Sequence, residues 1–263
     1  MTTHSSPTSV RPPSLDPADA RAWIASWDAQ QATFFTDREE RFAVVVDVLE
    51  TVLGRPDPLV VDLGCGPGSL AARIHDRLPG AAVVGADMDP LLLGLARAAH
   101  GDWLTLHHLD LRDPGWVERL GLDRDPDAVV SSTALHWIDR GPLRSVLSAA
   151  AAALAPGGVI IDADHIRDVD LPDVEDEIGR RSVGRSGPHD EAHDWPGWWA
   201  AAESAPELAD LVAERGRVDL DHAVTDEAHL ADYLDAMRHG GCHRAGTVWQ
   251  VGSDRVVVGI KRA

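Results

Sequence analysis

A short stretch in the first third of the chain combines an apolar run with closely spaced glycines. The sequence VVDLGCGPGSL spans residues 60–70, and its glycines are Gly64, Gly66 and Gly68. A strand, a glycine-rich turn and a helix start can form a nucleotide cradle, because glycines let the backbone approach the ligand and the helix end offers free N–H groups. The dinucleotide fingerprint requires a glycine at its sixth position, where this chain has Ser69. The spacing therefore disfavours a nicotinamide dinucleotide.

Three carboxylates indicate which nucleotide the turn would hold. Asp62 stands two residues before the first glycine, where it would repel a pyrophosphate and attract a cationic amino-acid group. Asp87, in VVGADMDP, follows the second apolar run, the position from which a carboxylate bridges ribose hydroxyls. Asp110, in LDLRD, could accept a hydrogen bond from an adenine amine while Leu111 packs on the ring. Each carboxylate alone could be a helix cap or turn residue, but together they describe adenosine with a cationic tail.

The elements that would position these residues alternate between strands and helices. Short apolar runs predict strands at 59–63, 82–86, 104–109, 128–132 and 159–163. The segments between them are long enough for helices, and largely apolar strands joined by helices indicate a parallel sheet covered on both faces. Near the end of the chain, two β-rich runs flank Gly252, Ser253 and Asp254, which predicts a hairpin. We therefore expect an α/β fold with a doubly wound sheet.

Composition divides the chain into four parts. Residues 1–16 are rich in Pro, Ser and Thr, which predicts a disordered leader. Residues 17–165 are expected to form a cofactor-binding core with N-terminal helices, one starting at Pro17 and one spanning 37–53. Residues 166–224 are acidic and break the alternation, so we expect a helical lid or substrate insertion there. Residues 225–263 would complete the core with a helix from Thr225 to His239 and the hairpin.

The ordered motifs resemble those of class I S-adenosylmethionine-dependent methyltransferases. VDLGCGPG is similar to the family's first motif, GADMDP to its second, LDLRD to its third, and ALAPGGVIIDAD to its helix, turn and fifth strand. The resemblance runs from about Arg41 to Asp164 and resumes in the C-terminal hairpin. It implies a Rossmann-like seven-stranded sheet, mostly parallel with a C-terminal antiparallel hairpin, a helical lid insertion, and S-adenosyl-L-methionine as cofactor.

The resemblance also implies roles for individual residues. Asp62 and Gly64 would face the methionine part, Asp87 the ribose, and Asp110 with Leu111 the adenine. Arg41, on the preceding helix, is a candidate for the cofactor carboxylate, although an exposed helical arginine is usually only solvated. The cofactor-binding set implied in this way comprises Arg41, Asp62, Gly64, Gly66, Gly68, Asp87, Met88, Asp110 and Leu111.

Histidine and tryptophan residues are the candidates for the acceptor side. The stretch DAVVSSTALHWI places His136 and Trp137 just past the fourth strand, where open α/β sheets bind ligands, and it resembles the N-A-L-H-W stretch of trans-aconitate-type small-molecule methyltransferases. His136 would suit a general base, or it could only cap the strand's turn. His165, in DADHIRD, is a second candidate. In-line methyl transfer requires a base only if the acceptor keeps its proton, as an alcohol or carbon acid does.

The segment WPGWW, residues 195–199, could form an aromatic wall for the acceptor. Trp195, Trp198 and Trp199 could instead anchor a helical lid to the core, and both roles can hold for different rings. The motifs HDEAH (His189, His193) and HGGCH pair histidines four residues apart, but both stand in loop or helix-end contexts that do not fix two ligands on one face. We therefore predict no metal site.

Composition excludes several other classes. The formal net charge is −19 and no basic run occurs, which argues against nucleic acid as a partner. The single lysine, Lys261, lies near the C-terminus, which argues against a Schiff-base or P-loop enzyme. No apolar run is long enough to span a membrane and none resembles a secretory signal, and with only two cysteines the chain is expected in the cytoplasm.

These observations favour an enzyme that transfers a methyl group from S-adenosylmethionine to oxygen, nitrogen or carbon of a small molecule, with natural-product tailoring as one setting. A cofactor-using enzyme of another reaction class and a non-catalytic binder are the alternatives. The acceptor and the oligomeric state cannot be read from the sequence.

Overall fold

The protein is described by a computed structural model over residues 15–34, 37–185, 194–220 and 223–263. Most of the predicted leader, residues 1–14, lies outside the described residues. The described strands are β1 (Leu59–Leu63), β2 (Ala82–Asp87), β3 (Leu104–His108), β4 (Ala128–Ser132), β5 (Val159–His165), β6 (Cys242–Val251) and β7 (Asp254–Lys261). Each of the five predicted apolar runs forms a strand, with ends that agree within two residues.

The strands form one seven-stranded sheet in the order β3-β2-β1-β4-β5-β7-β6. Strands β1 to β5 pair in parallel, while β7 runs antiparallel to β5 and pairs with β6 as a hairpin through Gly252 and Ser253. All five residues of β1 are buried, as expected for a central strand with both faces covered. The predicted doubly wound, mostly parallel sheet with a C-terminal antiparallel hairpin is confirmed.

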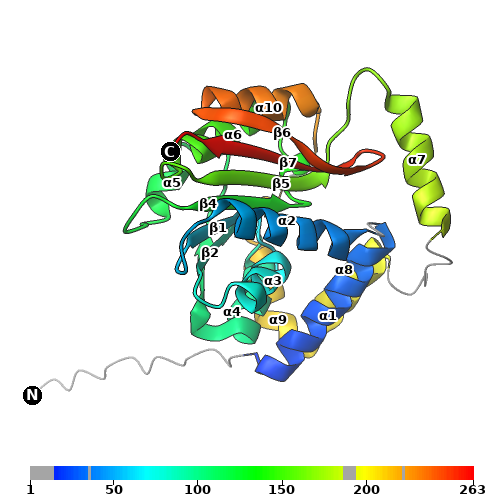
Figure 1. Cartoon of the computed structure of the whole chain (residues 1–263). Coiled ribbons are helices and arrows are strands. Elements are labelled where there is room, and N and C mark those ends of the chain that lie inside the picture. The colour runs from blue at the N-terminus through cyan, green and yellow to red at the C-terminus, as the bar shows by residue number, and fades with distance from the viewer. Residues whose placement is uncertain (1–14, 35–36, 186–193, 221–222) are drawn as a thin grey trace, which may run out of the picture.

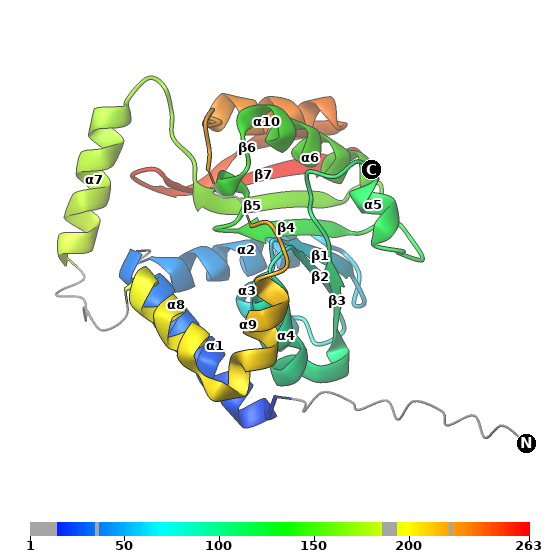
Figure 2. The same cartoon turned by 180° about the vertical axis from the view of Figure 1, so that it is seen from behind.

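Helices cover both faces of the sheet (Figures 1 and 2). On one face, Phe42 and Leu49 of α2 and Ile74 of α3 share an apolar core with the strands. On the other face, Leu147 and Tyr233 belong to a second core that contains α5, α6 and α10. These sheet-covering helices are α2 (Arg38–Val52), α3 (Ser69–Arg77), α5 (Trp116–Arg119), α6 (Arg140–Ala153) and α10 (Leu230–His239).

A third apolar core joins the start of the chain to the insertion that follows β5. It contains Ile24 and Trp27 of α1, Leu91 and Leu95 of α4, and Trp198 of α8. We call α1, α8 and α9 together the cap. The cap helices are α1 (Pro17–Phe34), α8 (Trp195–Ser204) and α9 (Ala209–Arg215), and the neighbouring helix is α4 (Pro90–His100). By contrast, α7 (Pro172–Arg185), also in the insertion, stands apart from the cap in Figures 1 and 2 and contacts β6.

The last helix begins later than the sequence predicts. We expected it from Thr225, but α10 starts at Leu230. The amides of Thr225 and Asp226 instead donate hydrogen bonds to the carboxylate of Asp139, at 2.7 and 2.9 Å. This contact, made across the fold to the start of α6, holds residues 225–226 outside the helix, and it could not be seen in the local sequence.

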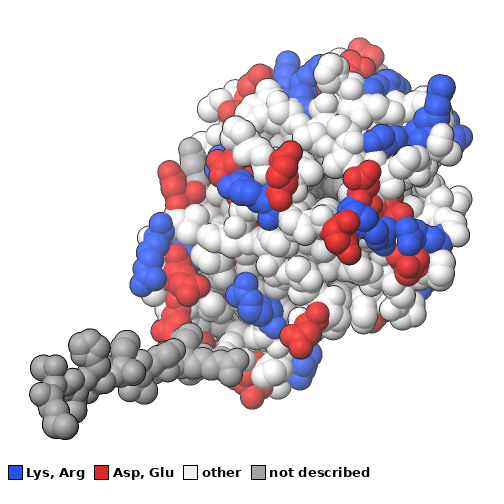
Figure 3. Space-filling view, turned by 90° about the vertical axis from the view of Figure 1, so that its left-hand side faces the viewer, with Lys and Arg blue, Asp and Glu red and all other residues white. Residues whose placement is uncertain are grey.

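Acidic and basic side chains lie next to one another on the surface. Figure 3 shows this on one face, where no large area carries a single sign. Among the described residues, no helix is long and apolar enough to cross a membrane.

Candidate active site

A pocket of about 470 Å³ opens at the carboxyl ends of the parallel strands. It lies where the chain leaves β1 and β4 toward opposite halves of the sheet, which is the usual ligand crevice of open α/β sheets. The cap closes the pocket from the other side. Of the residues predicted from the sequence, the pocket brings together Asp62, Gly64, Gly66, Asp87, Met88, Asp110, Leu111, His136, Trp137, His165, Trp195 and Trp199.

The glycine turn after β1 forms the floor of the pocket. Gly64 has a φ of 65°, and a Cβ on it would lie 2.3 Å from the Cβ of Ala134 in the turn after β4. Only glycine therefore permits the two turns to meet. The amide of Gly66 donates a hydrogen bond to Oδ2 of Asp87 at 2.7 Å, which fixes the turn against the end of β2.

Asp62 is a buried carboxylate with an unused oxygen. Its side chain is about 1% exposed, and its Oδ2 has no hydrogen-bond partner within the described residues. Burial, with a smaller contribution from the charge of Asp87, raises the pKa of Asp62 to about 8. An unpaired carboxylate is costly to bury, so its place in a ligand pocket indicates a seat for a cationic group.

Asp87 lies beside it at the end of β2. Its carboxylate accepts hydrogen bonds from the amides of Gly66 and Asp89, at 2.7 and 2.8 Å. Burial raises its pKa to about 6 despite these bonds. Asp89 in turn caps α4 and accepts a 2.7 Å hydrogen bond from Arg215 of the cap. Asp87 therefore has a fixed orientation at the edge of the pocket.

Asp110 lines the pocket but is already engaged. Its two carboxylate oxygens accept hydrogen bonds from the guanidinium of Arg112, at 2.8 and 3.0 Å. Burial alone would raise the pKa of Asp110, but these bonds lower it below its usual value. An adenine amine would share this carboxylate with Arg112.

Two residues of the predicted cofactor set do not line the pocket. Arg41 is fully buried behind it, where it donates to the carbonyl of Ala163 at 3.4 Å and pairs with Asp254 at 3.6 Å. Gly68 caps α3 with a φ of 85° and packs against His100, so its role is local. Arg38, one helical turn before Arg41, does reach the pocket, together with Gln31 of α1. Sequence reasoning named Arg41 and missed Arg38; both are buried on the inner side of α2, but only Arg38 lines the pocket.

His136 belongs to a buried Asp–His pair. Its Nδ1 lies 2.6 Å from Oδ1 of Asp164, whose side chain is fully buried at the end of β5. Burial alone would lower the pKa of His136, but the charge and hydrogen bond of Asp164 raise it above its usual value. Because Asp164 takes Nδ1, Nε2 is the ring nitrogen left for the pocket. Sequence reasoning missed Asp164, although it stands next to His165 in DADHIRD.

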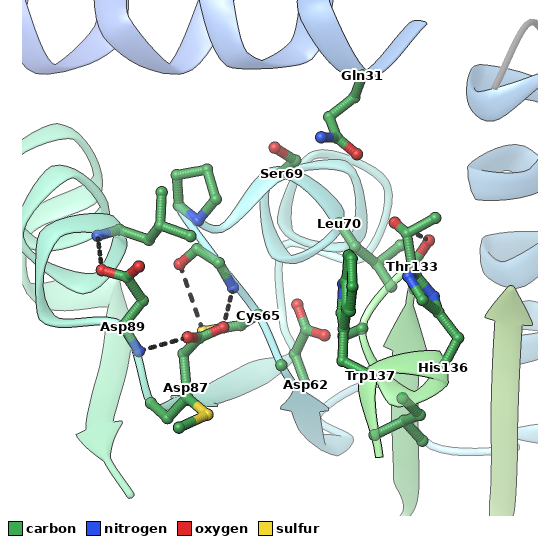
Figure 4. A pocket seen from close by; sticks show the side chains of 18 of the residues that line it. Gln31, Asp62, Cys65, Ser69, Leu70, Asp87, Asp89, Thr133, His136 and Trp137 are labelled. Atoms are coloured by element: carbon green, nitrogen blue, oxygen red, sulfur yellow. Dashed lines mark hydrogen bonds between the residues drawn. The ribbon is translucent and has the colours of Figure 1, made fainter. Parts of the chain in front are cut away.

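His165 has a partner of the same kind. Its Nδ1 lies 2.6 Å from Oδ1 of Asp254 at the start of β7, and its ring centre is 6.5 Å from that of His136. Both histidines also border a second opening, together with Trp137 and Arg167. The two Asp–His pairs therefore lie at one end of the main pocket. Figure 4 shows Asp87 and Asp89 at the opposite end from His136, Trp137 and Thr133, with Asp62 between them.

The tryptophans of WPGWW divide between two positions. Trp198 is buried, and its ring centre lies 4.9 Å from that of Trp27. Its indole N–H donates a hydrogen bond to Oγ of Ser26 at 2.9 Å, so Trp198 anchors α8 to α1. Trp195 and Trp199 line the pocket and pack against Trp27, with distances of 5.4 and 6.1 Å between ring centres. Trp198 therefore has the anchoring role considered for the motif, while Trp195 and Trp199 line the pocket and their contact with an acceptor stays a prediction.

The histidines of HDEAH, His189 and His193, lie outside the described residues. In the part of the chain that the structure describes, no group of three or more His, Cys, Asp or Glu side chains could hold a metal ion.

Fold and site together define a class of enzyme. A Rossmann-like sheet carries a glycine turn, an oriented carboxylate at the end of β2 and, near it, a buried carboxylate with one unpaired oxygen. The pocket therefore fits S-adenosylmethionine. This is the class I methyltransferase arrangement expected from the motifs.

Comparisons with known proteins agree with this assignment. Residues 61–160 match a family model described as a methyltransferase domain. Trans-aconitate 2-methyltransferase of Methylobacterium radiotolerans is 30% identical over 237 residues, covering 81% of this chain and 80% of that protein. The enzyme of the same name from Azoarcus sp. is 31% identical over 224 residues, covering 83% and 77%. Magnesium protoporphyrin IX methyltransferase from Synechocystis, solved with bound SAH, shares the fold with a TM-score of 0.54 at 18% identity, over 94% of this chain and all of that one.

The chain belongs to the S-adenosylmethionine-dependent methyltransferase family. It is a methyltransferase enzyme that uses S-adenosylmethionine, and its named relatives act on a small molecule. The predictions of family, cofactor and reaction are confirmed.

Proposed function

We propose that this enzyme methylates a small-molecule acceptor that binds beside His136, with the His136–Asp164 pair as general base. The observation that carries the proposal is the order of groups across the pocket, from Asp87 through Asp62 to His136. Ribose and methionine would occupy the first two positions, so an acceptor in line with the sulfonium would meet the third.

The cofactor would supply an electrophilic methyl group on a positively charged sulfur. Asp62 binds the methionine ammonium, Asp87 the ribose hydroxyls, and Leu111 with Met88 contact the nucleoside. Arg38 and Gln31, which line the pocket on the side of α1 and α2, bind the methionine carboxylate. Trp195 and Trp199 form the part of the cap that covers the acceptor, which is the function of the 166–224 insertion within the domain division expected above.

The base would act through Nε2 of His136. Asp164 holds the imidazole orientation through Nδ1 and stabilises the imidazolium that forms when the acceptor loses its proton. The free, buried cysteines Cys65 and Cys242 are compatible with the predicted cytoplasmic location, which remains part of this proposal.

Two measurements test the proposed function. Isothermal titration with S-adenosylhomocysteine should show binding that Asp62→Asn or Asp87→Ala removes. Single-turnover methyl transfer, followed by mass analysis of the product, should slow about 100-fold or more in His136→Asn while S-adenosylhomocysteine binding persists. Wild-type transfer rates in His136→Asn would contradict the role of His136 as a base.

A further inference from the structure

The basic side chains that line the pocket share one feature. Each of them already has an internal carboxylate partner. Among the described residues these pairs are Arg38 with Asp28 at 2.9 Å, Arg112 with Asp110 at 2.8 Å, His136 with Asp164 at 2.6 Å, and His165 with Asp254 at 2.6 Å. At the second opening, Arg167 pairs with Asp176 at 3.4 Å and Glu227 at 3.8 Å.

This pairing determines which acceptors the pocket can accept. A polycarboxylate such as trans-aconitate requires uncompensated arginine or lysine groups, because a buried anion without a cationic partner is costly. The pocket walls also carry Asp62, Asp87 and Asp89. Arg38 already pairs with Asp28, and under the proposed function the rest of its guanidinium faces the cofactor carboxylate. The walls therefore disfavour an acceptor with several negative charges.

Much of the remaining surface of the pocket is apolar, and five aromatic rings contribute to it. Trp27, Trp195 and Trp199 contribute rings from the cap, Phe42 a ring from α2, and Trp137 a ring next to His136. The cap rings are held in place, since Trp27 packs on Trp195 and Trp199, and the guanidinium of Arg215 lies 3.9 Å from the Trp199 ring centre. Preorganised aromatic walls bind flat apolar ligands at little entropic cost.

We propose that the acceptor is an uncharged, planar aromatic compound with a hydroxyl group, its ring among these tryptophans and its hydroxyl at Nε2 of His136. The inference rests on the proposed function. In the reaction, the hydroxyl proton moves to Nε2, the oxygen forms a bond to the methyl carbon, and the carbon–sulfur bond breaks with its electron pair left on a neutral thioether. The proton then leaves His136 to water. A carboxylate acceptor would arrive without a proton and give the base nothing to remove.

The test uses matched ligands on the full-length protein saturated with S-adenosylhomocysteine. 7-Hydroxycoumarin, its 3-carboxylate and trans-aconitate are titrated by calorimetry and by tryptophan fluorescence. We expect 7-hydroxycoumarin to bind at least about tenfold more tightly than its 3-carboxylate. We also expect it to gain one methyl group when S-adenosylmethionine replaces S-adenosylhomocysteine, whereas trans-aconitate gains none above the rate without enzyme.

Variants assign the binding to the aromatic walls. Trp195→Ala should weaken 7-hydroxycoumarin binding about tenfold while S-adenosylhomocysteine still binds, which also shows that the variant is folded. Trp249→Phe, on β6 outside the pocket, should change neither. Failure of 7-hydroxycoumarin to bind, binding of the 3-carboxylate at equal or higher affinity, or methylation of trans-aconitate would overturn the inference. Absence of S-adenosylhomocysteine binding would instead contradict the proposed function, and with it this one.

Discussion

At the scale of single residues, the site depends on two buried carboxylates that differ in whether the chain itself compensates their charge. Asp62 is buried and one of its oxygens has no hydrogen-bond partner, whereas the buried Asp164 is hydrogen-bonded to His136. The first is costly for the folded protein until a cationic ligand arrives, and the second is compensated within the chain. The same residue type therefore serves ligand binding in one place and orientation of a base in the other.

Replacing Asp62 should separate binding from stability. Because the pKa of Asp62 is raised to about 8, its carboxyl keeps a proton in the ligand-free fold at pH 7 that the unfolded chain releases, and this destabilises the fold by at most about 4 kcal/mol. Asp62→Asn should therefore keep or raise the unfolding temperature of the ligand-free protein while S-adenosylhomocysteine no longer raises it. Thermal unfolding with and without S-adenosylhomocysteine checks both, with the exposed Asp47→Asn as control. A lower unfolding temperature together with intact ligand stabilisation would contradict this account.

Replacing Asp164 should move the pH profile of the reaction. His136 acts as a base only when neutral, so kcat/KM should rise with pH through a pKa that Asp164 holds above the usual value for histidine. In Asp164→Asn that support is lost and burial lowers the pKa, so the inflection should move to lower pH while the plateau rate falls. Measurement of kcat/KM between pH 5 and 9 in both proteins tests this. An unchanged inflection would show that another group titrates. This pH range brackets the ordinary pKa of histidine, about 6.5.

At the scale of elements, the cap is fixed to the core at several points. Arg215 of α9 bonds Asp89 at the start of α4, and a Cβ on Gly94 would lie 2.4 Å from Cδ2 of Leu211, so α4 and α9 are in close contact. Trp198 fastens α8 to α1. The cap is therefore a fixed wall of the pocket, and the second opening beside Trp137 also borders His136.

Truncation of the two kinds of cap tryptophan should have different effects. Trp198→Ala removes a buried ring and should cost about 3 kcal/mol or more in free energy of unfolding, whereas Ser26→Ala, which removes only its hydrogen-bond partner, should cost about 1 kcal/mol. Trp195→Ala should cost less than Trp198→Ala, since Trp195 is only partly buried. Urea unfolding ranks the three. Equal losses for both tryptophans would show that Trp195 is an anchor as well.

At the scale of the whole molecule, the buried acids and the net charge both make the folded state less stable as pH rises. The pKa values of Asp62 and Asp87 are raised to about 8 and 6, and burial raises that of Asp162 as well. Between the unfolded value near 4 and these folded values, the folded state holds more protons, so stability falls as pH rises. The raised pKa of His136 has the same sign, and repulsion within a chain of net charge −19 also grows with pH.

The ligand-free protein should accordingly unfold at a higher temperature near pH 6 than near pH 8. Calorimetric scans across this range check the slope, and Asp62→Asn should flatten it. Saturating S-adenosylhomocysteine should flatten it too, because the bound ammonium favours ionised Asp62. A rise in unfolding temperature from pH 6 to pH 8 would contradict the assignment of the buried acids.

Much of the fold follows from local pattern. Apolar runs such as 59–63 must be buried on both faces, and the segments between them can only cross over as helices, so the parallel sheet was predictable. The hairpin followed from its turn residues. The start of α10 did not, because Asp139 captures the amides of Thr225 and Asp226 from another part of the chain.

By itself the sequence determined the cofactor, because the glycine turn, Asp62 and Asp87 occur within one strand–turn–helix–strand unit whose geometry is set locally. The tertiary structure alone decided the acceptor side. It placed Asp164 beside His136, and it put Arg38 rather than Arg41 in the pocket lining. It also placed Trp195 and Trp199 in that lining but left Trp198 outside it. These pairings join residues far apart in the chain, and burial and partner choice at such positions depend on packing that no local pattern records.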